Sequence, residues 1–231
     1  TNDQLTKLAS NYAAIGVRSP DLTREQITLM KSVNPDMLIS KYMGFASGYR
    51  VVSNQFLKEH PEVLLKTESG EIHRGLLNSG DNELVLDPRN TLWRDTLVNA
   101  AKKAVTEVGY DGIMADQTVM VNHLYEGFTG INPRTGDPYT TETWRDDMYT
   151  LLGDVKDAIG EDKLLIANSI RDGPGYFDEG AERFLEVTDG FIAEGFKGPI
   201  SWSTSMYPNE KDWVDDVEML TSIQEEGAYV V

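Results

Sequence analysis

Short, nearly continuous apolar runs alternate with longer amphipathic segments along most of this chain. The apolar runs occupy residues 13–20, 36–45, 110–119, 163–170, 190–196 and 228–231. Residues 2–12, 21–35, 90–108, 141–160, 178–187 and 209–227 carry apolar side chains at helical spacing. Strands that are buried on both faces and separated by helices are typical of βαβ units around a parallel sheet. The sequence therefore predicts the α/β class.

Two parallel architectures fit this alternation, an open doubly wound sheet and a closed (β/α)8 TIM barrel. No glycine-rich phosphate loop follows the first apolar run, which disfavours a dinucleotide-binding sheet. Acids and amides recur where strands end, as in a barrel whose active site is built there. A barrel needs eight strands, and the sequence offers six clear ones and a doubtful one at 83–90. We therefore expect one barrel domain over residues 1–231 that lacks a strand at one or both ends.

Composition narrows the range of partners. The chain has 38 acidic and 21 basic residues and a formal net charge of −17, so it should repel nucleic acid. It has no cysteine, which excludes thiolate chemistry and disulfides. No apolar run approaches the roughly 18 residues of a membrane span, and no signal-peptide pattern is visible. A neutral or cationic ligand is compatible with this charge.

Two strands share a pattern that ends on an acid. In "YDGIMADQT" an Asp-Gly pair opens the run and Asp116 follows, and in "TDGFIAEGF" another Asp-Gly pair is followed by Glu194. Side chains alternate along a strand, so each acid should face the barrel interior at the mouth, where it keeps access to water. Asp111 and Asp189 open the runs at the opposite end, where Asp-Gly is turn chemistry.

One strand separates the strand of Asp116 from the strand of Glu194, so the carboxyl groups of these two residues should lie roughly 5–9 Å apart. Two-carboxylate glycoside hydrolysis uses about 5–5.5 Å for retention and 6.5–9.5 Å for inversion. We expect Glu194 to be the proton donor and Asp116 the nucleophile or base. The competing interpretation is structural, because a strand-end acid often caps the following helix.

Four further residues are candidate substrate contacts. Lys41 and Tyr42 lie near the end of their strand, Asn168 ends the intervening strand, and Trp202 lies in the loop after Glu194, where it could stack on a sugar. Each of these side chains could instead be exposed on the surface, cap a helix or pack in the core. Trp93, Trp144 and Trp213 fall on predicted helices and are expected in the core.

No cofactor or metal is predicted. The three histidines lie far apart, without the spacing of a transition-metal site. No G-x-S-x-G elbow is present, which disfavours an α/β-hydrolase.

Five segments in order resemble a family of hypothetical TIM-barrel glycosyl hydrolases that act on polysaccharides. They are "LMKSVNPDMLISKYMGF", "FLKEHPEVLLKTESGEI", "LVLDPRNTLWRDTL", "YDGIMADQT" and "VTDGFIAEGF", and the resemblance covers roughly residues 5–231. It implies a barrel fold, Asp116 and Glu194 as the acids, and Tyr42 and Asn168 beside them. It also hints that a first barrel strand precedes Thr1. Val63 departs from the family pattern, which has an aromatic residue there.

The leading hypothesis is a hydrolase of O-glycosidic bonds in an extracellular or cell-surface polysaccharide. The alternative is an inactive barrel that binds glycans or joins a surface assembly. A lyase or aldolase with Lys41 as a Schiff-base lysine is a third interpretation. Sugar, linkage and stereochemistry stay open.

Overall fold

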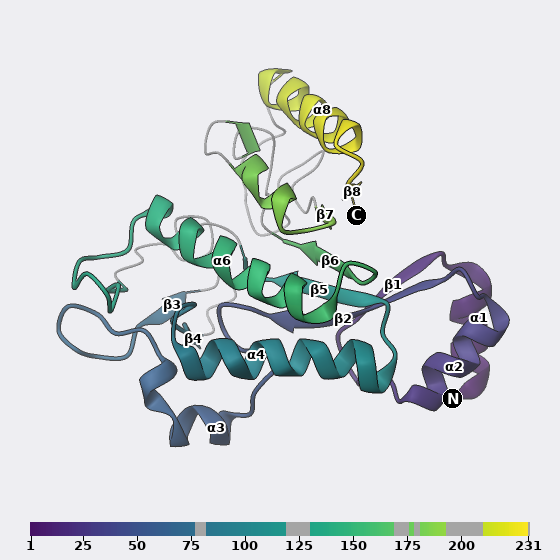
Figure 1. Ribbon diagram of the computed structural model, residues 1–231, viewed down its shortest axis with the longest axis horizontal. Helices are drawn as coiled ribbons and strands as arrows, with labels where there is room; N and C mark the ends of the chain where they lie inside the picture. The colour runs from purple at the N-terminus through teal and green to yellow at the C-terminus, as the bar shows by residue number, and fades with distance from the viewer. Residues whose placement is uncertain (77–81, 119–129, 169–175, 178–180, 193–209, 231) are drawn as a thin grey trace.

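The computed structural model describes residues 1–76, 82–118, 130–168, 176–177, 181–192 and 210–230. Its main sheet is parallel, with the strand order β1-β2-β5-β6-β7-β8. These strands are β1 Ala14–Val17, β2 Leu38–Gly44, β5 Gly112–Asp116, β6 Leu164–Ala167, β7 Gly190–Phe191 and β8 Tyr229–Val230. The small antiparallel pair of β3 Arg74–Leu76 and β4 Asn82–Leu84 lies beside it (Figure 1).

Helices occupy most of the predicted helical segments. They are α1 Asn2–Asn11, α2 Arg24–Val33, α3 Asn54–Glu59, α4 Thr91–Lys103, α6 Thr141–Ile159 and α8 Glu210–Glu225, with short turns η1 Pro61–Val63, η2 Ala104–Val108 and η3 Ala181–Glu186. Thr1, Thr23 and Thr140 close capping boxes at the starts of α1, α2 and α6. None of the helices in the described ranges is long and apolar enough to cross a membrane.

Two sequence predictions need correction. The helix expected at 178–187 is a six-residue 3-10 helix, η3, within the part that is described. The prediction that Trp213 lies in the core is wrong, because its side chain on α8 is exposed. Trp93 and Trp144 are fully buried, as predicted. Trp213 differs because helical position alone does not say which face of a helix meets the sheet.

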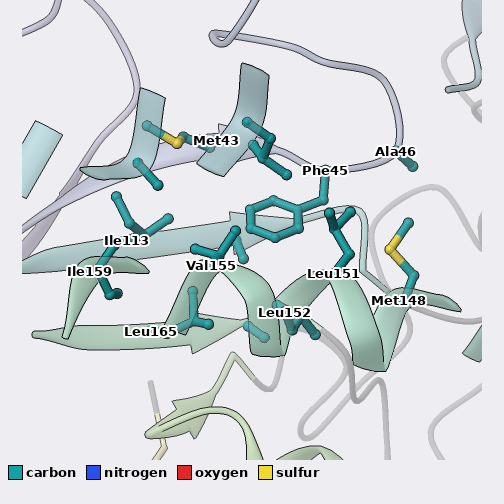
Figure 2. Packing of buried hydrophobic residues seen from close by; sticks show 14 of the residues in the cluster. Met43, Phe45, Ala46, Ile113, Met148, Leu151, Leu152, Val155, Ile159 and Leu165 are labelled. Atoms are coloured by element: carbon teal, nitrogen blue, oxygen red, sulfur yellow. The ribbon is translucent and has the colours of Figure 1, made fainter. Parts of the chain in front are cut away.

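The core lies between one face of the sheet and helices α4 and α6, which run side by side (Figure 1). Figure 2 shows Ile113 and Leu165 of the sheet facing Leu151, Val155 and Ile159 of α6. All five are buried. Alternate residues therefore point to the opposite face of the strands, and on β5 these are Gly112, Met114 and Asp116.

The two Asp-Gly aspartates join neighbouring strands at their amino ends. Asp111 Oδ2 accepts a 2.8 Å hydrogen bond from the Ile39 backbone N–H and lies 2.8 Å from Lys31 Nζ of α2. Lys31 Nζ also donates to the Met37 carbonyl, just before β2. One side chain thus ties β5, β2 and α2 together.

Asp189, just before β7, makes the same kinds of contact with β6 and α6. Its Oδ2 accepts a 2.7 Å hydrogen bond from the Leu165 N–H and lies 2.8 Å from Lys156 Nζ of α6. Lys156 Nζ donates to the Lys163 carbonyl, just before β6, at 2.7 Å. We call these two arrangements the Asp111 clamp and the Asp189 clamp, and their structural role agrees with the turn chemistry predicted for both acids.

The glycine of each Asp-Gly pair is required by close approach of the neighbouring strand. A Cβ on Gly112 would lie 2.2 Å from the Leu164 carbonyl oxygen, and one on Gly190 would lie 2.1 Å from the Tyr229 carbonyl oxygen. Because these contacts are with backbone atoms, a side chain could not be accommodated by rotamer changes. The repeated Asp-Gly pair is therefore a strand-start device.

Candidate active site at the carboxyl end of the sheet

Strand register sets the level of each polar side chain at the carboxyl end. Tyr42 of β2 pairs with Met114 of β5, which pairs with Ile166 of β6. Two residues further along β5 comes Asp116, opposite Gly44. Tyr42, Met114 and Asp116 share the face away from the helix-packed core, since each is an even number of positions from the next in register.

Three donors hold the Asp116 carboxylate. The Tyr42 hydroxyl donates to its Oδ2. The Asn168 side-chain amide donates to Oδ1 at 2.9 Å, and the Gln117 backbone N–H donates to the same oxygen at 2.8 Å. Both carboxylate oxygens are thus engaged and the group has one orientation. Such a group is suited to the role of a fixed nucleophile or base.

Asn168 is placed by the strand that ends one residue earlier. Its backbone N–H donates to the Ala115 carbonyl at 2.8 Å, which continues the pairing of β5 with β6. The side chain is buried, with 8% of its surface exposed. Its amide therefore reaches Asp116 across adjacent strands, and the structure brings together three of the predicted residues: Tyr42, Asp116 and Asn168.

Gln117 takes part in this site although no sequence pattern singled it out. It is buried and adopts a positive φ of 60°, which is uncommon for a residue with a side chain. Its Oε1 accepts hydrogen bonds from the backbone N–H and the hydroxyl of Ser47. This residue ties the end of β5 to the loop after β2, and a Cβ on Gly44 would lie 2.9 Å from that Oε1.

Arg18 is a second contributor without a predicted role. It follows β1 directly and is exposed, and its guanidinium carbon lies 5.6 Å from the Tyr42 ring centroid. A hydrogen bond with Tyr49, together with the charges of Tyr42 and Asp116, raises the pKa of Arg18. The sequence signal that could have identified Arg18 is its position at the end of an apolar stretch, which is the signal that identified Asp116.

Lys41 does not join this group, which corrects the prediction that it lines the same opening as Tyr42. It is buried, with 5% of its surface exposed, and pairs with Asp21. As the neighbour of Tyr42 in an extended strand, it points to the opposite face of the sheet. The sequence placed both residues near a strand end. The register shows that Tyr42, and not Lys41, lies on the face of the sheet that carries Asp116.

Glu194 and Trp202 lie outside the residues that the structure describes. The last described residue before Glu194 is Ile192, whose backbone N–H donates to the Ala167 carbonyl at 3.1 Å. The separation of the Asp116 and Glu194 carboxyl groups and the stacking role of Trp202 therefore stay predictions.

A separate buried acidic cluster lies between the segment before α4 and the start of α6. The Tyr139 hydroxyl lies 2.9 Å from Asp147 Oδ2 and 3.3 Å from Asp87 Oδ1, and Arg134 makes two 2.6 Å hydrogen bonds to Asp147. Desolvation raises the pKa of Asp87 and of Tyr139. These contacts connect the loop before α6 to that helix, so we assign the cluster to structure. Within the described ranges, no group of three or more histidine, aspartate or glutamate side chains is placed to hold a metal ion.

A polar cluster at the carboxyl end of a curled parallel sheet, with helices on the other face, is the arrangement of a partial (β/α) barrel, whose active sites are built at this end. The chain belongs to hypothetical glycosyl hydrolase family 15, whose profile matches residues 39–226. This agrees with the resemblance drawn from the sequence segments. No curated protein matches the chain.

Solved structures support the same fold. The glycoside hydrolase domain of PelA from Pseudomonas aeruginosa aligns with a TM-score of 0.64 at 13% identity, over 98% of this chain and 77% of that domain. A cycloisomaltooligosaccharide glucanotransferase from Paenibacillus sp., solved with cycloisomaltoheptaose, aligns with a TM-score of 0.62 at 13% identity. That alignment covers 99% of this chain and 35% of the glucanotransferase. At 13% identity, the structural similarity is evidence for a shared fold.

Proposed function

We propose that this protein is a glycoside hydrolase that cleaves O-glycosidic bonds of an extracellular or cell-surface polysaccharide with two carboxylates. Asp116 is the nucleophile or base, and Glu194 is the acid that protonates the leaving oxygen. Family membership and the neighbours' fold support a carbohydrate-active enzyme. The observation that carries the proposal is the Asp116 carboxylate, fixed by Tyr42, Asn168 and Gln117 at the carboxyl end of β5.

The chemistry follows from that fixed carboxylate. A nucleophile must meet the anomeric carbon from one direction, and a carboxylate held at both oxygens has lost the freedom to turn away. The leaving oxygen needs a proton from a second acid across the bond. The longer glutamate side chain suits that reach, and Tyr42 and Asn168 line the site beside the sugar while they hold Asp116 in place.

The proposed architecture is a (β/α)8 barrel in a single domain over residues 1–231, in which one or more of the eight strands are missing at one or both ends. Six of its strands are the parallel strands of the main sheet. Support comes from the fold likeness to the PelA domain, 77% of which this chain covers. A crystal structure in which the strands of the main sheet do not curl around a common interior would contradict it.

The direct test is a screen of polysaccharides for newly released reducing ends. The wild type should release them from at least one polymer, and Asp116→Asn and Glu194→Gln should each lower the rate about 10³-fold while leaving the fold intact. Asp95→Asn is the matched control, because it removes one exposed carboxylate on α4 away from the strand ends. Polymer binding without release by the wild type would instead favour the inactive glycan-binding barrel.

The anomeric form of the first product then defines the stereochemistry. Retention corresponds to carboxyl groups about 5–5.5 Å apart and inversion to about 6.5–9.5 Å. Proton NMR of the reaction mixture within the first minutes distinguishes the two products. A rate that both Asp116→Asn and Glu194→Gln leave unchanged would remove these residues from the mechanism.

A further inference from the structure

Two guanidinium groups converge on one phenol near Asp116. The Arg18 guanidinium carbon lies 5.2 Å from the Tyr49 ring centroid, and that of Arg50 lies 4.8 Å from the same centroid. Arg50 also donates a 2.9 Å hydrogen bond to the Tyr49 hydroxyl. The two cations together lower the pKa of Tyr49, with the Arg50 hydrogen bond as the main cause. We call these three residues the Arg18–Tyr49–Arg50 group.

This group lies one aromatic ring away from the proposed catalytic carboxylate. The rings of Tyr49 and Tyr42 meet edge to face, with centroids 6.0 Å apart and an interplanar angle of 85°. The Tyr42 hydroxyl in turn donates to Asp116. The group is therefore connected to Asp116 through a single side chain, Tyr42.

The backbone that carries Tyr49 is attached to the end of β2. The Gly44 N–H donates to the Tyr49 carbonyl at 2.8 Å, and the Tyr49 N–H donates to the Ser47 hydroxyl at 3.4 Å. Arg50 has a φ of 65°, a left-handed conformation that is strained for a residue with a side chain. Such a residue is held by its surroundings, so Arg50 and Tyr49 are presented by a defined turn, whereas Arg18 reaches the same ring from the end of β1.

Both arginines lack an acidic partner within the described ranges, although the chain has 38 acids. By contrast, Lys41, Arg94, Arg134 and Arg183 each have a carboxylate within ion-pair distance. Two like charges beside one partly exposed ring repel each other, and an anion between them would remove that repulsion. The charge of Asp116 acts on Arg18, but no described carboxylate lies within ion-pair distance of either guanidinium, so an anionic ligand between them would add a direct ion pair.

We propose that the Arg18–Tyr49–Arg50 group is a subsite for a sugar that carries a negatively charged substituent, such as the carboxylate of a uronic acid. Its position next to the cleaved sugar depends on the proposed hydrolase function, whereas anion binding by the group does not. Guanidinium groups bind carboxylates through paired N–H donors, and two of them lie at the Tyr49 ring. The subsite thus selects acidic polysaccharides even though the protein as a whole is acidic.

Binding of matched oligosaccharides tests this without any need for turnover. The probes are trimers of galacturonate, glucuronate and mannuronate, their neutral carboxyl-reduced counterparts, a 6-sulfated neutral trimer and a cationic glucosamine trimer. In NMR titrations at low salt, the wild type should bind at least one uronate trimer about tenfold or more tightly than its reduced counterpart. The preference should shrink as sodium chloride is raised.

Arginine variants locate the preference. Arg18→Gln combined with Arg50→Gln should abolish it, and Arg18→Lys with Arg50→Lys should retain part of it, because charge remains without the paired donors. The control is Lys102→Gln with Lys103→Gln, which removes two exposed positive charges at the end of α4, near the amino ends of the strands. Thermal melting of each variant confirms that it is folded.

Three results would overturn the proposal. They are equal or tighter binding of every neutral trimer, a uronate preference that survives in the glutamine double variant, and equal loss of that preference in the lysine control. Tighter binding of the sulfated trimer than of any uronate would keep the anion subsite and exclude the carboxylate as its ligand. A uronate preference without any hydrolysis would contradict the proposed hydrolase function and leave the subsite proposal standing. Hydrolysis that the arginine variants leave unchanged, together with no uronate preference, would sink this subsite alone.

Discussion

The two ends of β5 carry aspartates five residues apart, one with a charged partner and the other with neutral partners. At the amino end Asp111 meets Lys31 at 2.8 Å and a backbone N–H of β2. At the carboxyl end Asp116 has no lysine or arginine within ion-pair distance among the described residues, and its partners are the neutral donors Tyr42, Asn168 and Gln117. A neutralised carboxylate contributes to stability, whereas one held by neutral donors keeps its charge available for a substrate.

The repetition of the amino-end arrangement sharpens this difference. The Asp111 and Asp189 clamps use the same aspartate oxygen, a neighbouring strand N–H and a lysine from the helix before that strand. A motif that appears twice in one molecule with the same contacts serves a purpose common to both places, which is strand alignment. The carboxyl-end acids should therefore affect activity, and the amino-end acids stability.

The largest expected effect is on activity at the carboxyl end. Asp116→Asn should lower the hydrolysis rate about 10³-fold and change the free energy of unfolding by less than about 1 kcal/mol, because the amide can keep an acceptor oxygen in place. Rates on the polymer found in the screen and urea unfolding measure the two quantities. A large loss of stability with Asp116→Asn would erase the distinction between the two ends.

The next largest effect concerns the glycine of the Asp111 clamp. Gly112→Ala should destabilise the protein by about 3 kcal/mol, since its Cβ would lie 2.2 Å from the Leu164 carbonyl oxygen. The matched control is Gly153→Ala in the interior of α6, where the new Cβ makes an ordinary 3.5 Å contact with Val187. That change should stabilise by about 0.5–1 kcal/mol through helix propensity. Thermal melting of both variants would reveal opposite shifts, and equal shifts would contradict the close-approach argument.

Breaking the ion pair of the same clamp should have a smaller effect. Asp111→Ala should cost about 2 kcal/mol, because the Ile39 N–H loses its acceptor and the half-buried Lys31 loses its carboxylate partner. Combining it with Lys31→Met should show coupling of about 1 kcal/mol in a double-mutant cycle. Asp162→Ala, in the exposed pair with Lys163, should change stability by less than about 0.5 kcal/mol. Activity per folded molecule should stay at the wild-type level, and a loss of activity in Asp111→Ala would give the amino end a functional part.

The smallest effect comes from removing one donor at Asp116. Tyr42→Phe should lower kcat/KM about tenfold, the equivalent of one hydrogen bond to a charged group. Tyr149→Phe is the control, because its hydroxyl donates to Glu186 at 2.7 Å, away from the strand ends. Steady-state kinetics on the same polymer measure both variants. Unchanged kinetics for Tyr42→Phe would mean that Tyr42 orients nothing that matters to the reaction.

Much of the fold could be predicted from the chain alone, because its signals are local. Apolar runs predicted β2, β5 and β6, and helical spacing predicted α2 and α6. The 3-10 geometry of η3 was not predictable, because its six residues are too few for a period to show. The exposure of Trp213 was missed for a related reason, since the side of a helix that meets the sheet depends on packing.

The candidate site was predictable in part. Asp116 and Asn168 were found because a polar residue that ends an apolar strand is conspicuous, and the structure brings them to 2.9 Å. Lys41 was a candidate because it lies beside Tyr42 near a strand end, but neighbouring strand residues point to opposite faces, and the register shows that Tyr42 shares the face of Asp116. Arg18 and Gln117 were missed because their roles come from neighbouring segments, β2 and the loop after it.

The amino-acid order alone determined the α/β class, the parallel sheet and the two Asp-Gly strand starts, since periodicity and turn chemistry act over a few residues. Only the tertiary structure decided which carboxylates a lysine neutralises, which face Lys41 and Tyr42 take, and that two arginines share one tyrosine. Those outcomes depend on strand register and on contacts between residues far apart in sequence, and side-chain charges respond to neighbours in space.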